Sequence, residues 1–172
     1  KSFGANTKKL GKSLTKSLTL PLLAVGASSF KVAAEFEQSM LKVKAVSGAT
    51  GAEFKALEAD ALRLGSATRF SASEVSGLQL EFAKLGFTSS EITKVTEATL
   101  ALAQASDSDL ATAAEVAGST LRAFGLDASE TQRVTDVMAS SFSSSALDMS
   151  LFKDSMKFVA PVAKAAGLRL EE

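Results

Sequence analysis

Two serine–lysine pairs have the spacing that comes closest to an enzyme motif. Lys42 follows Ser39 by three positions, and Lys153 follows Ser150 by three positions. In some acyl-transfer enzymes this spacing lets a lysine help activate a serine nucleophile, but those enzymes also carry S-D-N and K-T-G motifs, which this sequence lacks. Serine and lysine three positions apart are common on helix surfaces. The pattern therefore does not predict catalysis.

Carboxylates are the other groups that could carry acid/base or metal chemistry. The sequence has no cysteine and no histidine, which excludes disulfides, histidine bases and the usual zinc and copper sites. The acidic pairs Glu35/Glu37 and Asp107/Asp109 do not have the spacing of a calcium loop. Their expected positions, at helix starts and on solvent faces, favour capping and solubility. We expect neither enzyme activity nor a cofactor.

The elements that would position these residues are helices, which a repeated end-and-start signal delimits. The stretches 85–91 and 124–130 each hold a glycine that can close a helix and an apolar residue that can fold back on the last turn. A cap residue follows in each, with a glutamate three positions later to complete a capping box. A shorter copy lies at Gly167-Leu168, before Glu171 and Glu172. Nothing in the sequence indicates a strand, so the predicted class is all-α.

These signals define a set of structural positions. Threonine, serine or aspartate should start helices, glutamate should complete capping boxes, glycines should lie just past helix ends, and a proline should kink the last helix. The positions are Thr50, Gly65, Ser71, Gly86, Thr88, Glu91, Gly125, Asp127, Glu130, Pro161 and Gly167.

The helices also repeat. The glycines at 86, 125 and 167 lie 39 and 42 positions apart, close to the length of a two-helix unit. A shorter repeat aligns Gly65 with Gly86, which predicts a helix end there too. Apolar residues recur 42 positions apart, from Leu110, Ala114, Ala117, Leu121 and Phe124 to Phe152, Met156, Val159, Ala163 and Ala166. Helices are predicted over about 51–64, 72–85, 89–105, 108–124, 128–142 and 149–166, packed as helical hairpins.

The N-terminal part differs in charge from the rest. The net charge is zero, but the stretch that precedes Glu35 holds six lysines and no acidic residue. Leu10, Leu14 and Leu18 form an apolar stripe on a predicted basic amphipathic helix. Its basic face, made of Lys8, Lys9, Lys12 and Lys16, could be a solvated face or could meet a membrane surface, an acidic protein wall or nucleic acid.

Three parts follow from this pattern. They are a basic helical arm at 1–20, a long helix at 21–47 that begins near Pro21, and a helical-hairpin core region at 48–172. The last residues, Glu171 and Glu172, fall where a new helix should begin. We interpret the sequence as a fragment of a longer protein.

Six short stretches occur in one order from about Leu18 to the end. They are residues 36–40, 46–50, 64–74, 83–88, 123–126 and 158–163. Together they resemble the tail tape measure proteins of tailed bacteriophages and prophages. The long helical remainder and the strongly apolar segments of full-length members have no counterpart in this sequence.

The resemblance implies a structural virion protein in the lumen or tip of the tail tube. Such a protein nucleates tube assembly, sets tail length and is ejected with the genome at infection. The implied partners are further copies of itself, with a trimer expected, tail tube and tail tip proteins, and assembly chaperones. DNA or a host membrane would be reached through the wider protein. The implied location is the virion, with assembly in the cytoplasm of the bacterial host, and no catalytic residue is carried over.

Two other classes of protein stay open. Capped two-helix units also build solenoid scaffolds, so a helical-repeat adaptor that binds a host protein is the first alternative. The uncharged stretch near 18–30, beside the basic stripe, resembles an interfacial anchor, so a membrane-active protein is the second. Helices rich in small residues between Ala98 and Ala123 further suggest self-association. Because the predicted helix ends follow one another at short intervals, we expect an anchoring domain rather than the measuring helix.

Overall fold

The computed structural model describes residues 20–145 and 148–171, with side chains described from residue 31 onward. Within these ranges every regular element is a helix, which confirms the all-α prediction. The elements are α2 (Leu20–Ser47), α3 (Gly51–Ala67), α4 (Ala72–Lys84), α5 (Ser89–Ala105), α6 (Leu110–Phe124), the 3-10 turn η2 (Ala128–Glu130), α7 (Thr131–Ser144) and α8 (Met149–Ala165).

The chain divides into two compact units. The first ends at Gln38 and the second begins at Ser39, so the division falls inside α2 rather than at its end. In the first unit, Lys31 and Glu35 form an exposed ion pair at 3.7 Å, one helical turn apart. No helix in the described part of the chain is long and apolar enough to cross a membrane. The predicted basic arm, with Lys8, Lys9, Lys12 and Lys16, lies outside the described residues.

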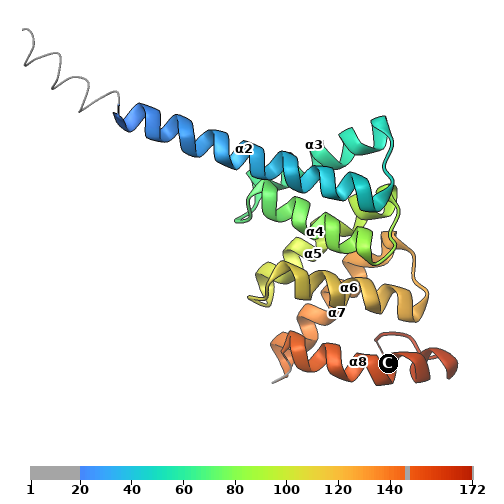
Figure 1. Ribbon diagram of the computed structural model, residues 1–172. Helices are drawn as coiled ribbons and strands as arrows, with labels where there is room; N and C mark the ends of the chain where they lie inside the picture. Colours follow the sequence, from blue (N-terminus) through green and yellow to red (C-terminus); the bar gives the residue numbers. More distant parts are fainter. Residues whose placement is uncertain (1–19, 146–147, 172) are drawn as a thin grey trace, which may run out of the picture. The chain divides into compact units, whose positions relative to one another are not determined.

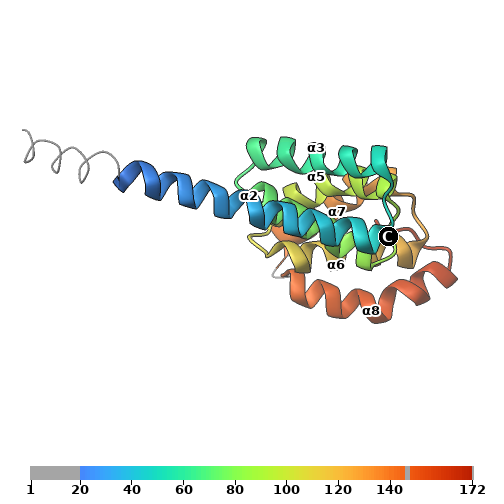
Figure 2. The same ribbon diagram turned by 45° about the horizontal axis from the view of Figure 1, so that its top comes forward.

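The second unit is an array in which each helix from α3 to α6 packs on the next helix and on the helix two positions along. Consecutive helices α3 and α4, and α5 and α6, form pairs in contact. In addition α3 contacts α5 and α5 contacts α7, while α4 contacts α6 and α6 contacts α8 (Figures 1 and 2). The odd-numbered and even-numbered helices thus form two stacked rows, the arrangement of a helical repeat protein.

The core lies between the two rows and is apolar. Its largest fully buried side chains come from every helix of the array except α8, and include Leu57, Leu78, Phe82, Ile92, Leu121 and Met138. Burying one side chain of this size stabilises the fold by about 1.5–3 kcal/mol. Small residues permit close approach: a Cβ atom on Gly118 of α6 would lie 2.7 Å from Leu85 Cδ1 and 3.4 Å from the rings of Phe82 and Phe87. Many of the small residues between positions 98 and 123, on which the expected self-association was based, are buried within the chain itself.

The even-numbered helices all end on a glycine with positive φ. Gly48, Gly86, Gly125 and Gly167 have φ between +67° and +80° and follow α2, α4, α6 and α8. After α4, α6 and α8, the next residue's N–H donates to the carbonyl five positions back, at 3.1, 2.8 and 2.9 Å. These are Schellman caps, which need the left-handed conformation that glycine adopts freely. The nearly even spacing of these glycines along the sequence defines a two-helix repeat.

The odd-numbered helices end without a glycine, and the prediction for Gly65 was wrong. α3 continues through Gly65 to Ala67, and Thr68 Oγ1 then donates to the Leu64 carbonyl at 2.8 Å. A Cβ atom at Gly65 would lie 2.5 Å from the backbone N of Ala72 and 2.7 Å from its Cα. Glycine is required there because α3 passes close to the backbone that starts α4, not because the helix ends.

The other predicted bounds differ only slightly. α6 begins at Leu110 rather than 108, because Asp109 caps it. The helix expected from 128 opens as the turn η2 and becomes α-helical at Thr131. Pro161 lies inside α8, where it cannot donate the helical hydrogen bond, and Figure 2 shows α8 bending along its length.

Candidate interaction surface

The predicted cap residues start the helices of the array. The backbone N–H groups of Thr50, Ser71 and Thr88 each donate to a glutamate three positions later, at 3.0, 2.7 and 2.7 Å. At Ser71 and Thr88 the hydroxyl oxygen accepts in return from the glutamate N–H. Asp109 and Asp148 cap α6 and α8 through the N–H groups of Thr112 and Leu151, at 2.9 and 2.8 Å.

The capping box predicted for Asp127 and Glu130 does not form in this part of the structure. The Asp127 carboxylate accepts instead from the backbone N–H of Ser129 at 2.9 Å, which starts η2. The Glu130 carboxylate accepts from Arg133 Nε at 2.7 Å. Because a 3-10 turn comes before α7, Glu130 does not take the position from which it could reach back to the cap residue.

These contacts keep the cap glutamates charged. The backbone N–H of Ser71 holds the pKa of Glu74 below its ordinary value, and the N–H of Thr88 does the same for the pKa of Glu91. The hydrogen bonds favour the carboxylate over the protonated acid. The groups are explained as helix caps and none needs a catalytic role.

The serine–lysine pair on α8 is also explained structurally. Lys153 Nζ donates to Glu115 Oε2 of α6 at 2.7 Å, which raises the pKa of the Lys153 ammonium. A protonated, paired lysine is a poor base for Ser150. The carboxylates of Asp107 and Asp109 are likewise engaged, the first with Arg69 at 3.5 Å and the second as a cap. Among the described residues no cluster of three or more acidic side chains could hold a metal ion.

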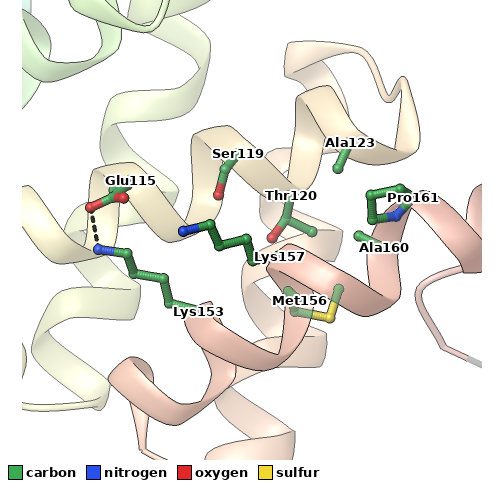
Figure 3. Close-up of a pocket in the computed structure, with 9 residues that line it drawn as sticks. All are labelled: Glu115, Ser119, Thr120, Ala123, Lys153, Met156, Lys157, Ala160 and Pro161. Atoms are coloured by element: carbon green, nitrogen blue, oxygen red, sulfur yellow. Dashed lines mark hydrogen bonds and ion pairs between the residues drawn. The ribbon is translucent and has the colours of Figure 1, made fainter.

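A groove of about 280 Å³ runs between α6 and α8 (Figure 3). Figure 3 shows Lys153 and Lys157 reaching from α8 toward α6, where Glu115 and Ser119 lie. Nearer the C-terminal end of α8 the lining is mainly apolar and consists of Met156, Ala160, Pro161, Thr120 and Ala123. The groove is a packing boundary between successive repeats.

On α6 and on α8, a basic side chain reaches the glycine turn that ends the preceding even-numbered helix. Arg122, in the last turn of α6, donates from Nη2 to the Gly86 carbonyl at 3.1 Å and lies over the Phe87 ring at 4.0 Å. One repeat further on, Lys164 of α8 takes the corresponding position: its Nζ lies 2.8 Å from where a Cβ of Gly125 would be. This contact was not predicted from the sequence, although a basic residue stands three positions before both Gly125 and Gly167 and was a signal for it.

A continuous exposed apolar surface of the array is on α8, and we call it the α8 outer face. Phe158 is 75% exposed and Val162 is 69% exposed. The face consists of Phe158, Val159, Val162, Ala163, Ala166 and Leu168. Exposed apolar surface of this kind is typical of a site where another protein element packs.

The fold and these packing surfaces define a helical repeat protein. The chain matches the family described as phage-related minor tail protein over residues 58–172, and it belongs to that family. It is 41% identical over 174 residues to the tape measure protein of Pneumococcus phage Dp-1, an alignment that covers 100% of this chain and 15% of that relative. It is 32% identical over 140 residues to the probable tape measure protein of Escherichia phage P2, covering 80% of this chain and 17% of the relative.

The resemblance to tape measure proteins is thereby confirmed, and with it a structural role in a phage tail. The chain spans only 15% and 17% of the length of these two relatives. No solved structure matches the chain.

Proposed function

We propose that this chain is an anchoring domain of a tape measure protein, and that it does not form part of the helix that measures the tail. The supporting observation is the way the helices fold back. From α3 to α8 each α-helix has only 13 to 17 residues before a turn reverses the chain. A ruler adds about 1.5 Å for every helical residue, whereas packed short helices do not add their lengths.

The proposal gives the array a fixed place in the lumen or tip of the tail tube. It acts there without enzyme activity, in agreement with the ion pair that engages Lys153 and with the capping role of Asp109. In this role it would hold further copies of itself, as a trimer, and tube and tip proteins during nucleation, with chaperones acting before assembly. Setting of tail length and ejection with the genome would then belong to the whole protein, of which this array is the anchored part.

Deletion of one repeat tests the anchoring role. Removing residues 86–124 takes out α5 and α6 and joins Leu85 to Gly125, so that the glycine-capped end of α4 is preserved. We expect phages with this deletion to form no tails or misassembled tails in electron micrographs. Gly77→Ala, a change into open space, should leave tails normal.

The ruler hypothesis makes a different prediction for the same deletion. Tails of normal form, shorter by about 60 Å at about 1.5 Å for each deleted residue, would show that the segment measures length. That result would overturn the anchoring role.

A further inference from the structure

Helices α6 and α8 can be compared position by position because both end in the same cap. Gly125 and Gly167 are equivalent, and each is followed by a leucine whose N–H closes the Schellman bond, at 2.8 and 2.9 Å. A shift of 167 − 125 = 42 positions along the sequence therefore relates α6 to α8. The same shift relates the basic residues Arg122 and Lys164, each of which reaches the preceding glycine turn.

At two equivalent positions the residue on α6 is buried, whereas the residue on α8 is apolar and exposed. Val116 is 1% exposed, whereas its equivalent Phe158 is 75% exposed. Thr120 is 2% exposed, whereas its equivalent Val162 is 69% exposed. The residues at these positions of α8 are larger and more apolar than those of α6, so α8 has the side chains of a covered helix without a cover in the described structure.

The array itself shows what covers such positions. α6 is contacted by the next two helices, α7 and α8. In the described structure α8 packs on α6 and meets α7 through the Phe142 and Phe152 rings, 5.4 Å apart. By the same arrangement, the next two helices of the array would contact α8. Those two helices would form a further two-helix unit.

The cap residue gives an independent indication. The apolar residue after the α4 glycine, Phe87, is only 3% exposed, because α6 covers it with Gly118 and Arg122. The equivalent residue after α8, Leu168, is 47% exposed. An even-numbered helix beyond α8 would cover Leu168 as α6 covers Phe87.

We propose that the α8 outer face seats a further two-helix unit of the same array, contributed by the same polypeptide in the full-length tape measure protein. The relatives have room for such units, since the matched region accounts for 15% and 17% of their length. The proposal rests on family membership and on the repeat register. It goes beyond the anchoring role, and each could fail without the other.

Cysteine accessibility tests the proposal, because this sequence contains no cysteine. Phe158→Cys and Val162→Cys are each introduced into the present chain and into the full-length protein. The rate at which a maleimide alkylates each cysteine is measured by mass spectrometry of the peptides and compared between the two proteins. The control is the adjacent Lys157→Cys, whose equivalent on α6, Glu115, is exposed within the array. Hydroxyl-radical footprinting of Phe158 in both unmutated proteins gives a readout that no substitution can disturb.

We expect alkylation at positions 158 and 162 to be at least about tenfold slower in the full-length protein, because a buried thiol reacts only through local opening. Position 157 should change less than about twofold, and Phe158 should be protected from radicals in the full-length protein. Equal reactivity and footprints in the two proteins would overturn the proposal. Protection that grows with concentration, in either protein, would also overturn it, because a second copy would then be the cover.

Discussion

Two helical glycines differ in whether the structure has room for a side chain at their positions. At Gly65, inside α3, an added Cβ would lie 2.5 Å from the backbone N of Ala72, which cannot move aside without displacing α4. At Gly77, inside α4, an added Cβ meets nothing within 4 Å. Helix propensity alone would favour alanine at both positions. The local packing therefore decides the sign of the effect.

Gly65→Ala should lower the free energy of unfolding by about 1–3 kcal/mol, the usual cost of overpacking. Gly77→Ala should raise it by about 0.5–1 kcal/mol, since alanine loses less backbone entropy in a helix. Urea unfolding followed by circular dichroism measures both. A stabilising Gly65→Ala would contradict the close approach of α3 to the start of α4.

The cap glutamates make stability depend on pH. The pKa of Glu91 is lowered in the folded state, chiefly by the Thr88 N–H. A carboxyl with a lowered pKa contributes stability above its unfolded value, about 4.5, and loses that contribution as the pH falls through the lower folded value. Glu91→Gln should therefore reduce the free energy of unfolding at pH 7 by about 0.5 kcal/mol, and by less at pH 3.5.

Urea titrations at the two pH values measure this difference. Glu37→Gln, which removes the same charge from an exposed position of α2, is the control and should show a smaller pH-dependent difference. If the Glu91→Gln deficit were as large at pH 3.5 as at pH 7, the carboxylate would not be the capping species.

At the scale of single residues, the sequence predicted the helix caps well but predicted the roles of the glycines only in part. Thr88 with Glu91 has a local signature, because a capping box involves residues only three positions apart. Gly65 was misassigned because its surroundings in the sequence copy those of Gly86, while its actual constraint comes from the backbone of Ala72. Glu130 was misassigned because the 3-10 turn at 128–130 depends on packing that the local pattern does not contain.

At the scale of elements, the link between successive even-numbered helices depends on Arg122. Its guanidinium is shared among the Gly86 carbonyl, the Phe87 ring and Glu91, the last at 3.5 Å. Arg122→Ala should lower the free energy of unfolding by about 1–2 kcal/mol through loss of a charged hydrogen bond and a cation–π contact.

Arg122→Lys should recover only part of that loss, since an ammonium cannot both stack flat on the ring and keep the same fork of donors. Thermal unfolding measures the stability of the two Arg122 variants. Lys153→Ala, which removes the Lys153–Glu115 ion pair between α6 and α8, is the variant with which they are compared. An Arg122→Ala variant as stable as the native chain would show that the contact does not link the repeats.

Helix identity and position could be read from the sequence, but burial could not. The repeat of apolar positions predicted the same face on α6 and α8, and Phe152, the first residue of that face on α8, is indeed buried. Val159 is 54% exposed although its equivalent Ala117 is fully buried. Burial depends on which element lies opposite, and a pattern within one helix does not carry that information.

At the scale of the whole molecule, the two-helix repeat is what builds the array. Each even-numbered helix ends on a glycine, and after α2, α4 and α6 the chain reverses into an odd-numbered helix, so the helices stack into two rows. The sequence predicted the repeat length and the helical hairpins. It did not reveal that only alternate helices end on glycine, because the extra copy at Gly65 suggested a shorter period.

The central claim is that this part of the protein stays folded back when it is in the tail. Spin labels at Lys55→Cys on α3 and Gln132→Cys on α7 test it, because both positions are exposed and the native sequence has no cysteine. In assembled tails, with labelled protein diluted by unlabelled protein, double electron–electron resonance should give a distance of about 20–30 Å, since α3 and α7 are separated by one helix at interaxial distances of about 10 Å. A single measuring helix would place the labels about 115 Å apart. A distance distribution with no population below about 60 Å, roughly half the single-helix value, would contradict the anchored array.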